Sequence, residues 1–386
     1  MSSGTNHPCV WIIAGEASGD NYGAMLAEAL RQRRPELRLR GMGGEQMRAA
    51  GVELFVDSSE LGVVGLVEVL KSLRFFIRLL REVSARALAE RPAAVVLIDY
   101  PGFNLRLAER LRCAGIPVVY YISPQVWAWK KGRIPRIARD VDKMLCIFPF
   151  EPAVYAGTGL DASFVGHPLL EILAPLRHKP PSRDPNLVLL LPGSRSSEIK
   201  ALFPDFLRTA AQLQQARPEL HFMVPLPRQS CLEQVKALAA ATPLPLALSL
   251  EYSVGETRQW LSRASAGLAA SGTVTVEAAI LGLPLVVAYR LNPISWHILK
   301  RIVKLPYVTI ANLVTQRCVY EEYLQTDAVP EKLAPALLSI LPGGKRHANV
   351  VAGIQECVTQ LGGDDAVSLR VADAVLATMK EDAAKT

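Results

Sequence analysis

Residues 266–277 read Ala266-Gly-Leu-Ala-Ala-Ser-Gly-Thr-Val-Thr-Val-Glu277 and indicate the fold most directly. The apolar run Ala266–Ala270 predicts a short buried strand, and Val274–Leu281 has the pattern of a helix. Only three small residues, Ser271 to Thr273, separate the two. A buried strand that passes within a few residues into a helix is typical of parallel α/β sheets.

The same alternation of short apolar runs and helical patterns recurs in both halves of the chain. In the first half the expected strands are Val10–Ala14, Ala93–Ile98, Val118–Ile122, Met144–Phe148 and Ser163–Val165. In the second half they are Leu187–Leu191, Phe222–Val224, Leu244–Leu248, Ala266–Ala270 and Leu285–Ala288. We therefore predict an α/β protein with two Rossmann-like, doubly wound domains.

A polar, proline-rich stretch at residues 178–185 separates the two series of strands, and the expected linker lies near residues 170–185. The predicted domains are an N-terminal one, 1–175, and a second one, 176–345. The segment after Pro330 is helical and alanine-rich and contains no further strand pattern. Residues 346–386 are therefore expected to be helices that pack back across the domains.

Composition limits the classes of protein to which the chain can belong. Its 386 residues are half hydrophobic and one fifth charged, which indicates a well-cored globular protein. The six cysteines show no C-x-x-C spacing, and no signal-peptide core or apolar run of about 20 residues is present. These features predict a cytoplasmic protein with reduced thiols.

The net charge of +7 favours anionic partners. Phosphate-bearing substrates and an acidic membrane face both fit, while a merely solvated basic surface is the alternative. No basic run interleaved with aromatic residues is present, so nucleic acid is not an expected partner.

In a doubly wound sheet, ligands bind just past the carboxyl ends of the strands. In the second half, Gly193, Ser194 and Arg195 follow the strand Leu187–Leu191. The glycine permits a tight turn, and the arginine could neutralise a diphosphate through a bidentate contact. The alternative is an ordinary turn with a surface arginine, in which one of the serines that follow caps the next helix.

The turn Ser271-Gly272-Thr273 is the strongest candidate for a nucleotide site. Its small side chains leave the first amides and the positive end of the next helix open to a phosphate. Glu277 lies about one helical turn further on, where it could accept hydrogen bonds from ribose hydroxyls. The alternative is a plain helix cap with an exposed glutamate. The chain lacks the glycine-rich loops of P-loop and standard dinucleotide sites.

The first half offers a similar small-residue turn, Gly15–Asp20, which opens a helix and contains Glu16, Ser18 and Asp20. Gly41–Gly44 is a second glycine-rich turn.

Asp99 directly follows the strand Ala93–Ile98 and precedes Pro101 by two residues. A carboxylate at the carboxyl end of a strand is a candidate general base, although many carboxylates in that place cap a helix. Trp127 and Trp129 follow the next strand and either line a sugar or acyl site or pack between loops.

Asp140-Val-Asp142 has the D-x-D spacing of metal-dependent sugar transferases. It precedes a predicted strand, whereas such a metal site would follow one, so we interpret it as a solvated helix end. No cluster of histidines and cysteines offers a zinc site. The sequence therefore predicts neither a metal nor a cofactor.

An amphipathic segment near residue 70 predicts contact with a membrane or lipid. The apolar residues that form one helical face are Leu66, Leu70, Leu73, Ile77 and Leu80. The apolar arc is widened by Phe75, Phe76 and Leu79. The basic residues on a different face are Lys71, Arg74, Arg78 and Arg81. A wide apolar arc with basic flanks suits a helix lying in an anionic membrane surface. The alternative is a helix covering the sheet, and part of the segment is expected to do so.

Eight segments, in order from residue 11 to about 327, jointly resemble the lipid-A-disaccharide synthases of glycosyltransferase family 19. They are Ala14-Gly-Glu-Ala-Ser-Gly-Asp20, Asp99-Tyr-Pro-Gly-Phe-Asn104, Ser123-Pro-Gln-Val-Trp-Ala-Trp129, Phe148-Pro-Phe-Glu151, Phe164-Val-Gly-His-Pro168, Leu191-Pro-Gly-Ser-Arg195, Ser271-Gly-Thr-Val-Thr-Val-Glu277 and Tyr307-Val-Thr-Ile-Ala-Asn-Leu313. No single segment is specific, but the set is. The family pattern often has a second acidic residue where this chain has Gly102.

The resemblance implies the GT-B fold, in which two Rossmann-like domains face an active-site cleft. It also implies a reaction: UDP-2,3-diacylglucosamine donates its sugar to the 6-hydroxyl of 2,3-diacylglucosamine 1-phosphate, with inversion, giving the β-1,6-linked lipid A disaccharide 1-phosphate and UDP. Peripheral association with the cytoplasmic side of the inner membrane fits the amphipathic segment. The oligomeric state is left open, a homodimer included.

The resemblance also implies residue roles. Asp99 would take the proton from the acceptor hydroxyl, while Arg195 and the turn Ser271–Thr273 would stabilise the departing diphosphate. Glu277 would hold the uridine ribose. The other residues implied for the UDP pocket are Asn312 and Gln325, with Gly193 and Ser194 beside Arg195. The residues implied to face the cleft from the acceptor domain are Glu16, Ser18 and Asp20.

Two alternatives remain at this point. A nucleotide-sugar epimerase of the same fold would not need the amphipathic segment and would turn over a UDP-sugar alone. A two-lobed binding protein would have no need for Asp99, and such proteins are usually exported.

Overall fold

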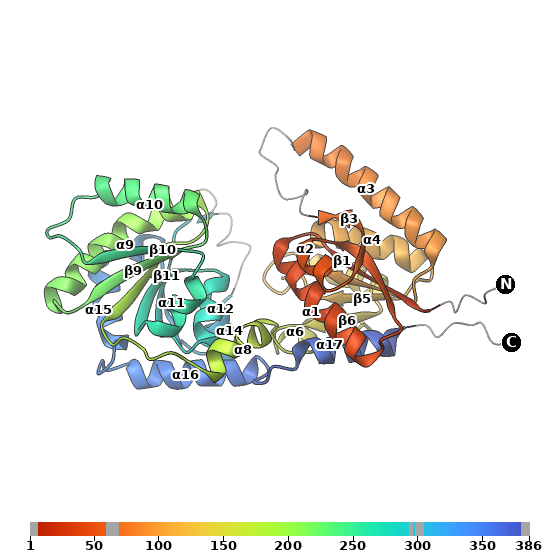
Figure 1. Cartoon of the computed structure of the whole chain (residues 1–386). Coiled ribbons are helices and arrows are strands. Elements are labelled where there is room, and N and C mark those ends of the chain that lie inside the picture. The colour runs from red at the N-terminus through yellow and green to blue at the C-terminus, as the bar shows by residue number, and fades with distance from the viewer. Residues whose placement is uncertain (1–6, 59–68, 293–295, 298–304, 380–386) are drawn as a thin grey trace. The chain divides into compact units, whose positions relative to one another are not determined.

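The computed structural model describes residues 7–58, 69–292, 296–297 and 305–379. The chain forms two compact units (Figure 1). Unit 1 comprises Met1–Glu171 together with Asp364–Thr386, and unit 2 comprises Ile172–Gly363. Unit 2 is therefore inserted into the sequence of unit 1.

A parallel sheet of seven strands forms the centre of unit 1 in the described residues, in the order β3-β2-β1-β4-β5-β6-β7. The strands are β1 (Cys9–Ala14), β2 (Arg38–Gly43), β3 (Glu53–Asp57), β4 (Ala94–Ile98), β5 (Val118–Tyr121), β6 (Lys143–Cys146) and β7 (Asp161–Phe164). The strand order reverses between β1 and β4, which pair from Val10 with Ala94 to Ala14 with Ile98. The carboxyl ends of these two strands therefore define the switch point at which such sheets bind ligands.

The helices of unit 1 follow its strands along the chain. They are α1 (Ala17–Arg33), α2 (Glu45–Ala49), α3 (Val69–Glu90), α4 (Pro101–Cys113), the short turn η3 (Lys131–Arg133), α5 (Ile134–Asp140), α6 (Glu151–Val154), α7 (Leu169–Ile172) and α17 (Val367–Thr378). Strand β4 is buried at every position, as expected for a central strand covered on both faces. Helices α3 and α4 pack on one another, and residues of both join the core around Trp11.

A second parallel sheet forms the centre of unit 2, in the order β10-β9-β8-β11-β12-β13. The strands are β8 (Leu187–Leu191), β9 (His221–Leu226), β10 (Leu250–Val254), β11 (Ala266–Ala270), β12 (Leu285–Tyr289) and β13 (Glu321–Leu324). Strands β8 and β11 are adjacent and buried throughout. The order reverses between them, so Arg195 and Ser271 follow the two strands of this second switch point.

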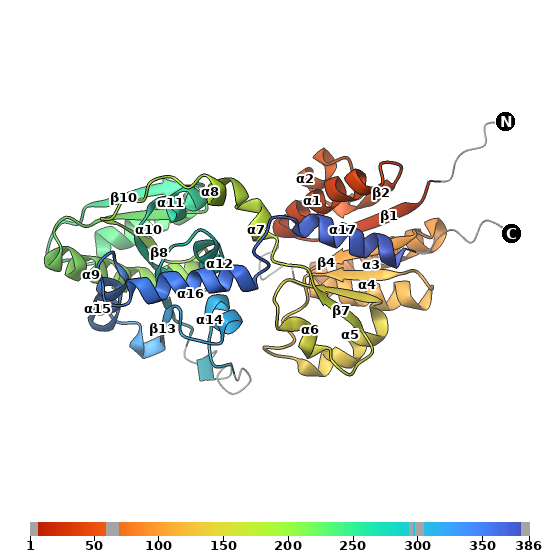
Figure 2. The ribbon, with the colours of Figure 1, turned by 90° about the horizontal axis from the view of Figure 1, so that it is seen from below.

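The helices of unit 2 are α8 (Ala174–His178), α9 (Ser196–Ala216), α10 (Gln229–Ala241), α11 (Thr257–Arg263), α12 (Thr273–Ile280), α14 (Ile310–Thr315), the turn η4 (Gln325–Asp327), α15 (Pro330–Ile340) and α16 (His347–Gln360). Helix α16 packs against α12, α14 and α15 (Figure 2). None of the helices in the described part of the chain has the length and apolar character needed to cross a bilayer.

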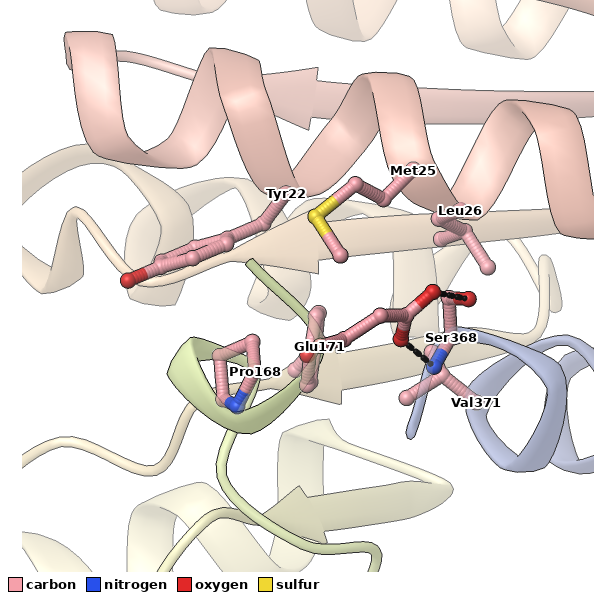
Figure 3. Close-up of a pocket in the computed structure, with 8 residues that line it drawn as sticks. Tyr22, Met25, Leu26, Pro168, Glu171, Ser368 and Val371 are labelled. Carbon is pink, nitrogen blue, oxygen red and sulfur yellow. Dashed lines mark hydrogen bonds between the residues drawn. The ribbon is translucent and has the colours of Figure 1, made fainter. Parts of the chain in front are cut away.

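The C-terminal helix α17 completes unit 1 by packing against α1, β4 and β5. The carboxylate of Glu171 accepts hydrogen bonds from the Ser368 backbone N–H at 2.8 Å and from the Ser368 hydroxyl at 2.5 Å, so it caps the start of α17 (Figure 3). Near the other end, the Arg33 guanidinium binds Asp373 at 2.8 Å. The predicted segment 346–386 is thus divided, since α16 belongs to unit 2 and α17 to unit 1.

Most predicted strands coincide with or overlap an observed strand, but Leu244–Leu248 is wrong. The edge strand that follows β9 in the chain is instead Leu250–Val254, whose residues are half-buried or exposed; among the described strands, β9 alone pairs with it. Strands β2, β3 and β13 were not predicted. Each contains or is bounded by arginine, aspartate or glutamate, so its apolar residues form only a short run.

Candidate active site

Asp99 lies directly past the carboxyl end of β4 in a rigidly held backbone. Its φ is +44° and that of Tyr100 is +48°, both in the left-handed region that side chains other than glycine rarely adopt. The Asp99 carbonyl accepts hydrogen bonds from the Tyr120 hydroxyl at 2.6 Å and from the Asn104 side-chain amide at 2.8 Å. Left-handed backbone held by buried partners is typical of functional sites.

The surroundings of Asp99 favour its protonated form. Burial raises the pKa of its carboxyl above the usual range, the nearby charge of Glu16 raises it further, and a hydrogen bond from the Tyr100 backbone opposes the shift. A carboxylate with a raised pKa is a stronger base than an ordinary aspartate. The geometry therefore suits removal of a proton from a hydroxyl group.

Replacing Glu16 by glutamine should shift the acid limb of the pH profile of kcat/KM to lower pH. The reason is that removing the Glu16 charge removes one of the two causes that raise the pKa of Asp99, and that pKa then falls toward its usual value. The measurement is kcat/KM against pH for the parent and Glu16→Gln. Glu28→Gln, at an exposed position on the same helix, is the matched control. An acid limb that stays in place or moves to higher pH would contradict the assignment.

The other residues of the turn Gly15–Asp20 have different surroundings. Glu16 precedes the first residue of α1, and Ser18 is exposed in its first turn. A Cβ atom on Gly15 would lie 2.3 Å from the Tyr100 ring, so the close approach of that ring requires glycine here. Glu16 and Ser18 thus lie open at the switch point.

Asp20 is placed differently from the prediction that it faces a substrate. It is buried, and its carboxylate accepts backbone N–H groups from Gly44 at 2.6 Å, Gln46 at 3.0 Å and Met47 at 3.1 Å. These amides open α2, so Asp20 caps that helix from α1. Gly44 is the N-cap residue of α2 and follows β2 directly, so residues 41–44 are mostly strand and not a free turn.

The two tryptophans after β5 have different roles. Trp127 donates its indole N–H to the Glu151 carboxylate at 3.1 Å and lies edge-on against Phe150, whereas Trp129 is 46 % exposed. Glu151 also accepts the backbone N–H groups of Ile147 and Phe148, and burial raises its pKa to about 7. Sequence reasoning gave Glu151 no role, although it ends one of the quoted family segments.

The D-x-D pair is not a solvated helix end. Asp140 is the last residue of α5, but its side chain is buried and binds Arg139 at 2.7 Å. Asp142 binds Arg112 at 2.7 Å and accepts the Val118 backbone N–H at 2.8 Å. Both carboxylates therefore neutralise arginines or hold the backbone.

In unit 2, residues Gly193 to Arg195 form the predicted turn after β8. Gly193 has φ +105°, and a Cβ atom there would lie 2.6 Å from the Glu198 carboxylate, so the turn requires glycine. Arg195 is the N-cap residue of α9, and its side chain is 77 % exposed and binds Glu198 at 2.6 Å. Neither serine that follows caps the helix; Glu198 accepts the Arg195 backbone N–H instead.

The turn Ser271–Thr273 opens α12 at the carboxyl end of β11. Gly272 is the N-cap residue and has no side chain to occupy the helix start. The Thr275 backbone N–H donates to the Gly272 carbonyl at 3.0 Å. The N–H groups of Thr273 and Val274 precede it at the helix start, where amides have no acceptor within the helix and can bind an anion. Glu277 is one turn further along; its Oε1 pairs with Arg258 at 2.9 Å, and within the described residues Oε2 has no such partner.

The side-chain amides of Asn312 and Gln325, for which the resemblance implies a place in the UDP pocket, contact other residues of unit 2. Asn312 is fully buried, and it donates to the Tyr320 carbonyl and Glu322 and accepts the backbone N–H groups of Val319 and Tyr320. All of its hydrogen-bonding capacity is therefore used to hold the segment that enters β13. With its amide oriented so that donor meets acceptor, Gln325 pairs with the backbone N–H and carbonyl of Leu291 at 3.1 Å each, which joins the segments that follow β13 and β12. Both residues position backbone in the structure.

The predicted membrane-binding residues fall only partly within the described region. Leu66 lies outside it, and the structure does not describe the side chains of Leu70, Lys71 and Leu73. Further along α3, Arg74, Phe75, Ile77 and Arg78 are exposed, Phe76 is half-buried, and Leu79 and Leu80 are buried. Helix α3 therefore covers the sheet with its second half and exposes two large apolar side chains near its start.

Comparison with known proteins gives a consistent result. The family model described as lipid-A-disaccharide synthetase matches residues 10–370. The lipid-A-disaccharide synthase of Anaeromyxobacter dehalogenans is 38% identical to this chain, over 96% of this chain and 97% of the relative. That of Methylobacillus flagellatus is 39% identical, over 89% of this chain and 92% of the relative.

Solved structures share the architecture at low sequence identity. The UDP-GlcNAc 2-epimerase from Neisseria meningitidis bound to UDP-GlcNAc has a TM-score of 0.63 at 10% identity, covering 96% of this chain and 100% of that one. The glycotransferase of kitacinnamycin has a TM-score of 0.63 at 15% identity, covering 97% and 100%. The fold is therefore GT-B, as the sequence predicted.

Proposed function

Since the chain belongs to the lipid-A-disaccharide synthase family and is a glycosyltransferase of lipid A disaccharide synthesis, we propose that it transfers 2,3-diacylglucosamine from its UDP derivative to the 6-hydroxyl of 2,3-diacylglucosamine 1-phosphate. The observation that carries the proposal is the Asp99 carboxyl, with its raised pKa, at the switch point of unit 1. Inversion requires one base to activate the acceptor hydroxyl as it attacks the anomeric carbon.

The donor is proposed to bind unit 2. The solved structures that share the fold include a complex of S. aureus MnaA with UDP, which has a TM-score of 0.65. The diphosphate would bind the first amides of α12 together with the guanidinium of Arg195, which is exposed at the start of α9. The free oxygen of Glu277 is suited to a ribose hydroxyl.

The deciding experiment is incubation of the protein with UDP-2,3-diacylglucosamine and the monosaccharide phosphate, followed by detection of the disaccharide and of UDP. Absence of disaccharide would reject the proposal. Donor alone should remain unchanged, because a lasting change in the sugar without acceptor is the outcome expected of an epimerase. The epimerase likeness rests on 10–12% identity and concerns the fold alone.

Peripheral membrane association is part of the same proposal, since both substrates carry acyl chains. Phe75 is 47 % and Ile77 42 % exposed on α3, with Arg74 and Arg78 exposed beside them. Apolar side chains flanked by arginines suit insertion between anionic headgroups.

Replacing Phe75 and Ile77 together by glutamine should reduce binding to phosphatidylglycerol vesicles on the order of tenfold, because two apolar side chains no longer enter the acyl boundary. Co-sedimentation with vesicles measures the effect. The matched control is Leu88→Gln on the same helix, at a position 53 % exposed but far from the arginine pair along the chain. Equal loss in both variants, or no loss in either, would reject this surface.

A further inference from the structure

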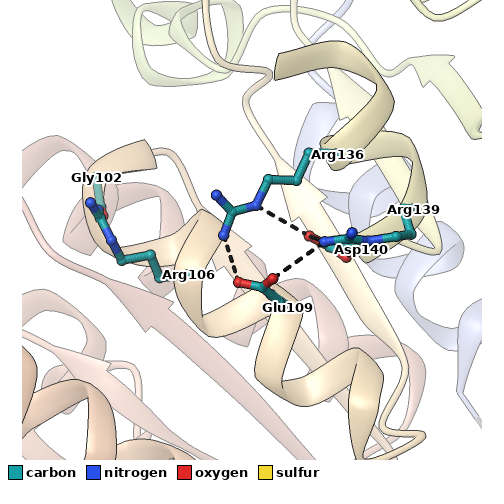
Figure 4. A network of polar contacts seen from close by, with 6 residues as sticks. All are labelled: Gly102, Arg106, Glu109, Arg136, Arg139 and Asp140. Atoms are coloured by element: carbon teal, nitrogen blue, oxygen red, sulfur yellow. Dashed lines mark hydrogen bonds and ion pairs between the residues drawn. The ribbon is translucent and has the colours of Figure 1, made fainter. Parts of the chain in front are cut away.

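A small groove with arginines in its walls lies beside the start of α4 in unit 1. Its volume is about 90 Å³. One wall is the first part of α4, with Pro101, Gly102 and Arg106, and the other is formed by Arg133 and by Arg136 of α5. Figure 4 shows Arg106 on one side of this region and Arg136 with its carboxylate partners on the other.

The charges of this groove are unequal. Arg136 binds Glu109 at 2.5 Å and Asp140 at 3.6 Å, and Arg139 shares the same two carboxylates (Figure 4). Within the described residues, Arg106 binds only the backbone carbonyl of Gly102, and neither it nor Arg133 has a carboxylate partner. Three arginines and one carboxylate, that of Asp140, line the groove, and Asp140 is already paired with Arg136 and Arg139. The positive charges of Arg106 and Arg133 are therefore left for an anion.

The groove adjoins the backbone of the proposed base. Pro101 and Gly102, which line it, follow Asp99 by two and three residues. Tyr120 lies within the electrostatic reach of both Asp99 and Arg133. Burial raises the pKa of its phenol well above the usual value. The charge of Asp99 raises this pKa further, and the positive charge of Arg133 lowers it. Asp99 and Arg133 therefore act on the same phenol.

We propose that this groove binds the phosphate monoester of the acceptor sugar through Arg106, Arg133 and Arg136. The inference rests on the proposed function, in which the acceptor carries its phosphate on C1 and its reactive hydroxyl on C6, on either side of the ring oxygen of one sugar. With the phosphate among the arginines, the sugar extends back toward Asp99. Guanidinium groups bind phosphate oxygens in a bidentate manner and are the side chains best suited to this task.

Gly102 adds no charge to the groove, whose one lining carboxylate, Asp140, is already paired with arginines. A Cβ atom placed there meets nothing within 4 Å, so a larger side chain has room. An aspartate in the first turn of α4 would be favoured by the helix dipole and would lie beside Arg106. Gly102→Asp is thus a substitution that tests charge without removing an arginine.

The test compares Arg106→Gln, Arg133→Gln and Gly102→Asp with the parent enzyme. Each should raise KM for the acceptor phosphate on the order of tenfold, because a charge-assisted contact is lost or neutralised. The KM for the UDP-sugar and the value of kcat should remain unchanged. Arg112→Gln is the matched control, since it lies on the same helix and binds Asp142 away from the groove.

An acceptor without its phosphate identifies the group that is recognised. The parent should bind this compound poorly, and the three substitutions should have no further effect on it. If the substitutions weaken binding of the dephosphorylated acceptor as much as binding of the phosphorylated one, the groove does not bind the phosphate and the inference fails. Selective loss of binding to phosphatidylglycerol vesicles, with KM for the acceptor unchanged, would likewise overturn it and assign the arginines to lipid headgroups.

Equilibrium binding of the acceptor without donor separates this inference from the proposed function. Phosphate-dependent binding that is weakened by the substitutions, in a protein that forms no disaccharide, would reject the reaction and retain the groove. Disaccharide synthesis with a KM unaffected by all three substitutions would retain the reaction and reject the groove.

Discussion

Replacing Asp99 by asparagine is expected to reduce kcat by about 10²- to 10⁴-fold, the usual contribution of a general base. Asparagine keeps the shape of the side chain and leaves the backbone contacts of residue 99 to Tyr120 and Asn104 intact. It cannot accept a proton from the acceptor hydroxyl. The KM values for both substrates should change little, because the lost interaction belongs to the transition state.

The control for this experiment is Asp161→Asn at the start of the edge strand β7, where the carboxylate is exposed and, among the described residues, pairs with Lys143 alone. It should retain parental activity and stability. In the parent, the acid limb of the kcat profile should lie above the pH expected for an ordinary aspartate, since the pKa of Asp99 is raised. Full activity of Asp99→Asn would reject the general base.

Replacing Arg195 by alanine should lower kcat by about 10²- to 10³-fold, comparable with the loss of one donor from a preorganised site for a developing anion. Negative charge accumulates on the diphosphate as the bond to the sugar breaks, so the arginine matters more in the transition state than in the ground state. The KM for the UDP-sugar should therefore rise much less than kcat falls.

Arg195→Lys separates charge from geometry. Lysine restores one positive charge without the planar pair of donors, so it should recover only part of the lost activity. Arg208→Ala is the matched control, because Arg208 lies on the same helix, α9, and binds Asp205 there. An increase in KM alone, with kcat unchanged, would show that Arg195 contributes only to binding of the donor.

The sequence predicts the framework of both units because the central strands are buried on both faces. Strands β4, β8 and β11 form continuous apolar runs, and their bounds were predicted to within one residue. Edge strands are half-exposed, so their apolar signal is weak; β10 was misplaced and β13 was not predicted. Local pattern also places Asp99 and Arg195 at strand ends, which requires only the order of residues along the chain.

The roles of Asp20 and Asn312 could not be predicted from local pattern. Asp20 binds amides that lie 24 to 27 residues further along the chain, and Asn312 binds the backbone of residues 319 and 320. A polar residue in a family segment can contact a ligand or hold the backbone that does, and the sequence does not distinguish these roles. The structure adds that Asn312 is fully buried and that its amide makes a complete set of hydrogen bonds within unit 2.

The cap that Glu171 places on α17 has a consequence for biogenesis. Unit 2 is continuous in sequence, so all of its strands have been synthesised once β13 has left the ribosome. Unit 1 has all seven of its strands much earlier, yet the surface that α17 covers on α1, β4 and β5 stays open until the last helix emerges. Unit 1, whose strands are translated first, is therefore completed last. The surface that α17 covers remains accessible to chaperones while unit 2 is synthesised.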